Sequence, residues 1–128
     1  MNEDVQLSIV VENKPNTLAT LMKKLRDEFI EIKAIIAEGA GDRGIVRMIV
    51  NEPEKTGKIL EKEGYKYAKD RVLVVNAKDN EELQTILNKL GTNNVNLKCI
   101  YLCDKNANFS SFILVCEDIE RAKKVLGG

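Results

Sequence analysis

The sequence carries the same pattern twice, and this repeat decides its architecture. When the chain is shifted by 65 residues against itself, positions 6–63 align without a gap with positions 71–128. Apolar residues keep one register in both halves, and identical residues recur at Val10/Val75, Leu18/Leu83, Lys24/Lys89, Leu25/Leu90, Lys33/Lys98, Ile35/Ile100, Val50/Val115, Glu52/Glu117 and Lys58/Lys123. We therefore expect two copies of one unit, residues 1–70 and 71–128. A unit of that size buries only about 60% of its unfolded surface, so each half needs the other or a partner.

The first half reads as strand, helix, strand, strand, helix, strand. β-Branched or alternating apolar segments predict its strands at 6–11, 30–36, 45–50 and 65–69. Apolar residues at helical spacing predict the first helix: Leu18, Leu21, Met22, Leu25 and Phe29. Residues 51–54 have the form of a capping box with an early proline, and they open a second helix that ends at Gly64.

The second half repeats this order up to its second helix. Its expected strands are 72–75, 95–103 and 110–116, with a helix from a capping box at Asp79 and Glu82 to Gly91 and another from Asp118. No residues remain for a fourth strand. The order predicts an α+β class fold of two tandem ferredoxin-like βαββαβ units, each an antiparallel sheet with both helices on one face, the second lacking its last strand.

The residue inventory excludes most chemistry. The chain has no histidine, which removes imidazole bases, Ser–His and Cys–His pairs and imidazole metal sites. Its three cysteines lack CxxC spacing, so we expect no catalytic activity, no metal and no cofactor. Lys plus Arg and Asp plus Glu number 20 each, and there is no tryptophan, which argues against a nucleic-acid partner. Short apolar runs and free thiols predict a cytoplasmic protein without a membrane segment.

Two stretches resemble a known family. IVVENKPNTLATLMKKL (residues 9–25) looks like the first strand, turn and helix of an ACT domain, the small ligand-binding module of amino-acid metabolism. GDRGIVRMIVNEPEKTGKIL (residues 41–60) is similar to the hairpin and second helix of tandem ACT proteins that consist of little else. The resemblance covers nearly the whole chain. It implies reversible binding of an amino acid or similar effector, with no chemistry performed on it.

The loop before the first helix is the main candidate site. It leads into a helix N-terminus, where unpaired N–H groups and the positive end of the dipole favour a carboxylate. Family members usually carry glycine after the proline, whereas Asn16 here tolerates left-handed geometry but partly fills the pocket. The alternative is that Asn13 or Asn16 only caps the helix. The candidate ligand-binding residues of this segment are Asn13, Lys14, Pro15, Asn16, Thr17 and Leu18.

Three further residues are candidates outside the loop. The resemblance implies that an asparagine at the start of the second strand reaches the ligand from a neighbouring domain, and Asn96 takes this place in the second half. The first half has Glu31 there, which pairs with a ligand ammonium group or faces solvent. Arg47, which the family's hairpin also carries, receives a carboxylate or forms an ion pair with Glu31 or Glu38. The second loop, 77–81, has gained acidic residues that would repel a carboxylate.

Two function hypotheses follow. The first is a non-catalytic regulatory module that binds an amino acid or similar small effector where ACT domains meet and signals to a partner such as a metabolic enzyme. The alternative is an assembly module that has lost its effector, which Asn16 and the degenerate second loop favour. RNA binding ranks last, because the first and third strands carry no aromatic residues.

The linker between the halves predicts the assembly. Joining the second-strand edges of both halves into one sheet requires a span of roughly 29 Å. Asp70 and Arg71, the expected linker, reach only about 7–10 Å. We therefore expect a homodimer in which the edge strands 30–36 and 95–103 pair with a second chain. The ligand site is then composite, with residues 13–18 of one chain and Glu31 or Asn96 across the seam.

Overall fold

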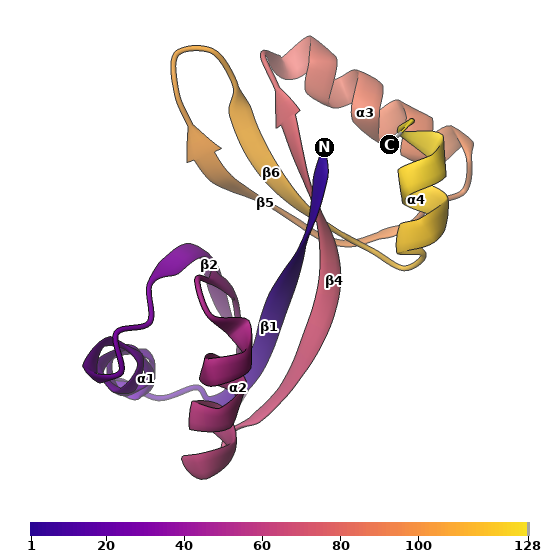
Figure 1. The fold of residues 1–128 in the computed structure, drawn as a ribbon. Coiled ribbons are helices and arrows are strands. Elements are labelled where there is room, and N and C mark those ends of the chain that lie inside the picture. The colour runs from indigo at the N-terminus through magenta and orange to yellow at the C-terminus, as the bar shows by residue number, and fades with distance from the viewer. Residues whose placement is uncertain (128) are drawn as a thin grey trace. The chain divides into compact units, whose positions relative to one another are not determined.

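The computed structural model describes residues 1–127, so that Gly128, the last residue of the predicted second half, lies outside the described part (Figure 1). Strands and helices alternate as the repeat predicts. The elements are β1 (Asn2–Glu12), α1 (Thr17–Asp27), β2 (Ile32–Ala40), β3 (Arg43–Val50), α2 (Pro53–Lys62), β4 (Lys66–Ala77), α3 (Asn80–Thr92), β5 (Leu97–Lys105), β6 (Ser110–Cys116) and α4 (Ile119–Val125).

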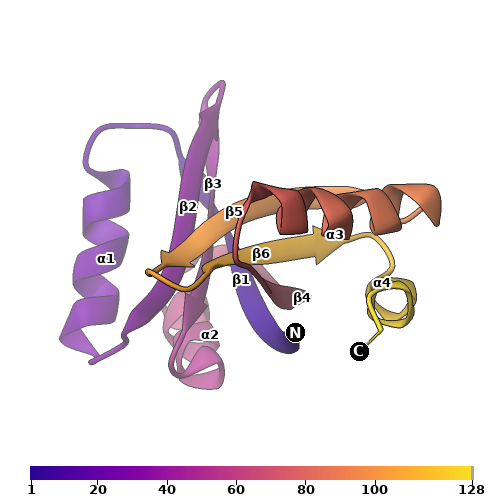
Figure 2. The same ribbon diagram turned by 90° about the horizontal axis from the view of Figure 1, so that it is seen from above.

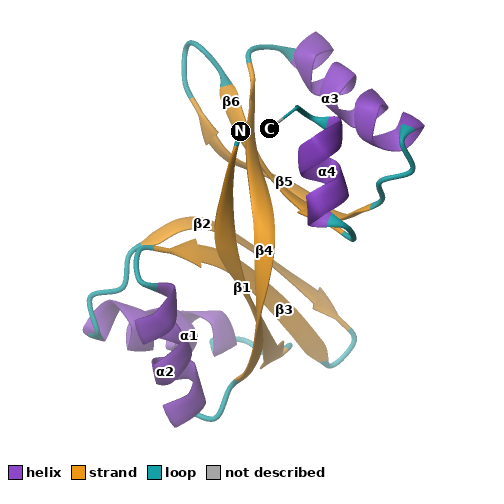
Figure 3. Cartoon of the chain, turned by 45° about the vertical axis from the view of Figure 1, so that its right-hand side comes forward, coloured by secondary structure: helices purple, strands orange, loops and turns teal. Residues whose placement is uncertain are grey.

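The chain divides into two compact units, with a boundary between Asp70 and Arg71. One unit is Val5–Asp70, and the other combines residues 71–127 with Met1–Asp4. Strands β1 and β4 each contribute residues to both units, because β1 begins at Asn2 and β4 runs from Lys66 to Ala77. Figure 3 shows that the two helices of each unit gather on one side of its strands.

The unit Val5–Asp70 contains four strands in the order β2-β3-β1-β4. β3 pairs antiparallel with β1 and with β2, and Leu7 faces Met48 in the register. Alternate residues of these strands point to the helices, as a period of two requires. In Figure 2, α1 lies alongside the β2–β3 ladder with its axis along the strands. The buried core between strands and helices is Leu7, Ile9, Leu21, Leu25, Ile30, Val46, Met48, Val50 and Leu60.

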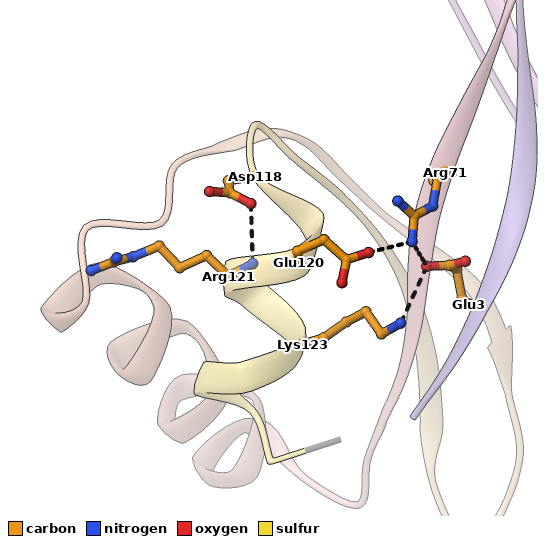
Figure 4. Close-up of polar contacts among 6 residues, drawn as sticks. All are labelled: Glu3, Arg71, Asp118, Glu120, Arg121 and Lys123. Carbon is orange, nitrogen blue, oxygen red and sulfur yellow. Dashed lines mark hydrogen bonds and ion pairs between the residues drawn. The ribbon is translucent and has the colours of Figure 1, made fainter.

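The other unit also has four strands, in the order β1-β4-β6-β5. The second half has no strand of its own after α4, as expected, and the beginning of β1 lies beside β4 in its place. Glu3 accepts a hydrogen bond from Arg71 at 2.7 Å, and Arg71 also donates to Glu120 of α4 at 2.5 Å (Figure 4). The first unit therefore differs from the predicted residues 1–70, because Met1–Asp4 complete the second.

The expected linker at Asp70 and Arg71 is wrong, because both residues lie within the continuous strand β4. The Ser8 hydroxyl donates a hydrogen bond to the Asp70 carboxylate at 2.7 Å. Arg71, the next residue, is bound to Glu3 and Glu120, and Lys123 lies 3.6 Å from the same Glu3 carboxylate. Each of the two residues thus has a side-chain partner on a neighbouring element, and the backbone stays extended between them.

Helix starts agree with the capping predictions in one case and differ in another. Asp79 accepts a hydrogen bond from the backbone N–H of Glu82, which confirms Asp79 as the cap of α3, whereas the Glu82 carboxylate accepts from the N–H of Lys78 and not from that of the cap residue. At α2 the predicted box is wrong: Glu52 occupies the cap position without a side-chain bond. The Asn51 side chain instead accepts a hydrogen bond from the backbone N–H of Glu31 at 2.9 Å. This fastens the start of α2 to the segment that leads into β2.

Phe29 does not belong to the buried stripe of α1. The helix ends at Asp27, and Phe29 has a φ of 61° and an exposed fraction of 83%. The residue after it, Ile30, enters the core instead. The turn between β2 and β3 is shorter than expected, since the strands continue to Ala40 and resume at Arg43 around Gly41, whose φ is 66°.

Candidate functional site

The loop between β1 and α1 places Asn16 at the cap position of α1. Its φ of 71° is left-handed, as expected of an asparagine where the resemblance implies glycine. The Asn16 side chain makes no capping hydrogen bond, although its carbonyl accepts from the N–H of Thr20 at 2.9 Å. Asn13 lies three residues before the cap. Neither asparagine therefore acts as a side-chain cap, which contradicts the alternative interpretation of the loop.

The N-terminus of α1 is electrostatically uncompensated. It has no side-chain cap and no acidic residue in its first turn. By contrast, Asp79 caps α3 and Asp118 caps α4, and both helices, like α2, have acidic residues in the first turn. The Thr17 N–H donates to the carbonyl of Lys14 at 3.3 Å. The next N–H groups, those of Leu18 and Ala19, lack intrahelical acceptors and remain available to an anion.

A small pocket lies between this loop and the β2–β3 hairpin. We call it the loop pocket. Its volume is about 160 Å³, below the range of about 300–1,000 Å³ of sites that enclose a drug-sized ligand. It therefore suits a small ligand or one end of a larger one. Four predicted residues line it, with others from β1, β2 and β3: Val11, Glu12, Asn13, Lys14, Thr17, Leu18, Ala37, Glu38, Gly39, Gly44, Ile45 and Val46.

Asn13 lines the loop pocket, but its amide group holds the hairpin. Its Nδ2 donates a hydrogen bond to the carbonyl of Gly41 at 2.8 Å, and its backbone N–H donates to the carbonyl of Asp42 at 3.0 Å. A Cβ atom on Gly39 would lie 2.6 Å from Asn13 Nδ2. The absence of a side chain at Gly39 therefore lets Asn13 lie flat on β2 and join the loop to the hairpin.

Glu38 lines the loop pocket, although the sequence indicated it only as an ion-pair partner of Arg47. Its carboxylate lies 3.5 Å from the Arg47 guanidinium, so the ion-pair interpretation of Arg47 is confirmed. Arg47 itself does not line the loop pocket. Two-thirds of the Glu38 side chain is exposed, which leaves carboxylate oxygen free to accept from a ligand.

Glu31 and Asn96 are not part of the loop pocket. The Glu31 N–H donates to the Asn51 side chain and the Glu31 carbonyl accepts from the Asn51 N–H, while the exposed Glu31 side chain has no ion pair within the described residues. Asn96 lies in the other compact unit and donates to the Glu117 carboxylate at 3.0 Å. The predicted contribution of these two residues stays a prediction about a neighbouring chain.

A second, larger groove borders the same loop. We call it the basic groove; its volume is about 690 Å³. The predicted residues Lys14, Pro15, Asn16 and Thr17 line it, but its other walls come from α1, the end of β1 and the turn between α2 and β4. Pro15 and Asn16 thus face this groove and not the loop pocket.

The cysteines do not form a reactive centre in the described residues. Burial raises the pKa of the Cys116 thiol, and burial together with Asp104 raises the pKa of Cys103, so both favour the unreactive thiol form. Residues 1–127 contain no group of three His, Cys, Asp or Glu side chains placed to hold a metal ion. None of their helices is long and apolar enough to cross a membrane.

Comparison with known proteins places these features in a family. No curated protein sequence matches the chain. A crystal structure of a protein from Bacteroides thetaiotaomicron is 25% identical with a TM-score of 0.89, covering 98% of this chain and 87% of that one. The ligand-free regulatory subunit of aspartate kinase from Thermus thermophilus shares the fold at 15% identity and a TM-score of 0.68, with 98% and 93% covered. The regulatory subunit of aspartate kinase from Thermus flavus shares the fold at 12% identity and a TM-score of 0.66, covering 98% of this chain and 92% of that one. The sequence profile of the ACT domain pair matches residues 3–127, and the chain therefore belongs to the ACT domain pair family.

Proposed function

We propose that this chain is a non-catalytic regulatory module that binds an α-amino acid or similar small effector in the loop pocket and passes its occupancy to a partner protein. The observation that carries the proposal is the start of α1, where a helix N-terminus without cap or acidic residue opens beside a small pocket. An α-carboxylate is the ligand group that such a helix start favours.

The walls of the loop pocket match the other groups of an amino acid. The N–H groups of Leu18 and Ala19 and the hydroxyl of Thr17 bind the carboxylate, because these donors lie in the first turn of α1. Glu38 accepts hydrogen bonds from the ammonium group. The apolar parts of Leu18 and Val46 contact the side chain of the effector.

The loop pocket is small and opens beside β2, which is the last strand in the order of its unit. We propose that a second copy of the chain completes it. In this homodimer the exposed edges of β2 and β5 pair with the partner, and Glu31 or Asn96 of the second chain reaches the effector. The regulated protein is an enzyme of amino-acid metabolism, and the three free cysteines fit a cytoplasmic location.

Thermal denaturation with each of the common L-amino acids at near-millimolar concentration tests the proposal. A ligand that binds only the folded chain raises the midpoint, by RT ln(1 + [L]/Kd) in free energy. The matching D-amino acid should raise it less. If no amino acid raises the midpoint, the chain is not an amino-acid sensor.

Two charge-neutralising variants then locate the site. Glu38→Gln should weaken the effector roughly ten-fold by calorimetric titration, because a hydrogen bond to a charged group contributes about 1.5–3 kcal/mol. Glu28→Gln serves as a matched control, since Glu28 is exposed in the same unit and lies outside the loop pocket. Equal affinities for both variants would exclude Glu38 from the site.

The assembly-module alternative retains one observation in its favour. In the second half, Asp79 stands in the loop that corresponds to residues 13–17, and its carboxylate accepts from the N–H of Glu82 in the first turn of α3, where an effector carboxylate would bind. Sedimentation equilibrium together with the thermal screen separates the two functions. A dimer that binds no amino acid supports assembly alone, whereas a monomer that binds one contradicts the composite site.

A further inference from the structure

We propose that the basic groove is a second ligand site, which borders the loop pocket at Val11, Glu12, Lys14 and Thr17 and takes a small dianion such as a phosphate monoester. The proposal goes beyond the proposed function, because it concerns another cavity and another ligand charge. It begins with the charge of the walls. Four cationic side chains, Lys14, Lys24, Arg43 and Lys66, line the groove, against the two carboxylates of Glu12 and Glu63. A net charge of +2 is thus concentrated in one cavity of a chain whose formal net charge is zero.

The two carboxylates engage only part of this positive charge. Glu12 lies 2.7 Å from Lys14, and the pKa of its carboxyl is lowered, mainly by that hydrogen bond. Glu63 lies 3.7 Å from Lys24. Arg43 acts on Glu12 only at longer range, and neither Arg43 nor Lys66 has an ion-pair partner within 4.0 Å among residues 1–127. Two exposed cations therefore face the groove without a carboxylate of their own.

The strand order brings these two cations to the same end of the sheet. Arg43 opens β3 opposite Glu12, the last residue of β1, and Lys66 opens β4 on the other side of β1. Their backbones are two strand spacings apart, roughly 10 Å. Arginine and lysine side chains are long enough to converge over the end of β1 on one ligand group.

The remaining walls fit a ligand that has an anionic head and an organic body. Arg43 offers a bidentate donor fork, which phosphate and carboxylate groups accept, and Lys66 adds a point charge. Thr20 supplies a hydroxyl donor from α1. Lys24 lies over the ring of Tyr65 at 4.9 Å, so its position is held by the aromatic face. The volume of about 690 Å³ is within the usual range for small-molecule sites, about 300–1,000 Å³.

Titration of the ¹⁵N-labelled chain with glycerol 3-phosphate, inorganic phosphate and succinate, each at constant ionic strength, tests the proposal. Dianion binding should shift the amide resonances of Lys14–Thr20 and Lys66, whereas sodium chloride at the same ionic strength should not. Tighter binding of the phosphates identifies a phosphate head, and tighter binding of succinate a dicarboxylate. If every dianion produces only the shifts that chloride produces, the site does not exist.

Variants separate this site from general charge attraction and from the amino-acid site. Arg43→Gln and Lys66→Gln should each weaken the best dianion about ten-fold. Lys58→Gln removes an exposed charge of the same unit outside the groove and should leave the affinity unchanged. Equal losses in all three variants would overturn the proposal. Glu38→Gln should retain dianion binding, so a failed amino-acid screen would leave this result independent.

Discussion

The contact between Asn13 and Gly39 allows a quantitative test of how the loop is held. In Gly39→Ala the new Cβ would lie 2.6 Å from Asn13 Nδ2 and 2.8 Å from its Cγ and Oδ1, so the Asn13 side chain must leave. The loss of its hydrogen bond to Gly41 destabilises the folded chain by about 1 kcal/mol, and crowding around the new methyl group destabilises it by about 1 kcal/mol more. Replacing glycine by alanine within a strand stabilises the folded chain by roughly 0.5–1 kcal/mol, because the unfolded chain has less conformational freedom to lose. We expect the free energy of unfolding to fall by about 1 kcal/mol.

The same substitution should have the opposite effect once Asn13 is absent. An Asn13→Ala background removes the three atoms nearest to a Cβ at Gly39, so Gly39→Ala should then stabilise the chain by about 0.5 kcal/mol. Urea unfolding followed by circular dichroism measures both differences. Gly91→Ala is the control, because no atom lies within 4 Å of a Cβ at this helical position, and it should stabilise both backgrounds equally. An identical effect of Gly39→Ala in the two backgrounds would refute the contact.

Three further predictions concern the two units. The hydrogen bond from Arg71 lowers the pKa of Glu3 in the folded chain below its unfolded pKa of about 4.5. The ion pair therefore stabilises the fold fully above pH 4.5, and this stabilisation is lost as the pH falls through the folded pKa. Glu3→Gln should make the loss of thermal stability below about pH 4.5 less steep, as measured by thermal denaturation over that pH range. Asp79→Ala should cost about 1 kcal/mol in urea unfolding, because it removes the cap of α3, and a change below 0.3 kcal/mol would contradict that role. Asn16→Gly should bind the effector as tightly as the native chain or more tightly in calorimetric titration, since glycine adopts φ 71° without strain and the Asn16 side chain does not line the loop pocket. Weaker binding would show that the Asn16 side chain contacts the effector after all.

The order of elements could be predicted because it depends on local patterns. Apolar periods of two and of 3.6 residues, repeated at one spacing, predicted the order of strands and helices, except that the strands expected at 65–69 and 72–75 form the single strand β4. The errors lie where a distant residue decides the outcome. Asp70 and Arg71 look like a linker until Ser8 and Glu3 are placed beside them. Asn51 looks like a helix cap, but it bonds to the backbone of Glu31.

The candidate site could likewise be predicted only where it depends on local patterns. The left-handed Asn16 follows from the residue type at a loop position, and the pairing of Arg47 with Glu38 follows from strand neighbours. The position of Asn13 on Gly39 depends on how the hairpin meets the loop, which no local pattern records. Arg43 and Lys66 are ordinary surface charges in the sequence, and only the strand order brings them to the same cavity.

The placement of Met1–Asp4 limits how the two copies of the repeat can be separated from one another. A segment encoded at the start of the first copy completes the sheet of the second, so the second half of the gene alone does not specify a whole unit. A fragment covering residues 71–127 would expose the edge of β4 that Glu3 and its neighbours cover, and such an edge invites pairing with other chains. Recombination that exchanges one copy alone would therefore separate a strand from its sheet. The second copy can therefore be transferred to another protein intact only together with Met1–Asp4.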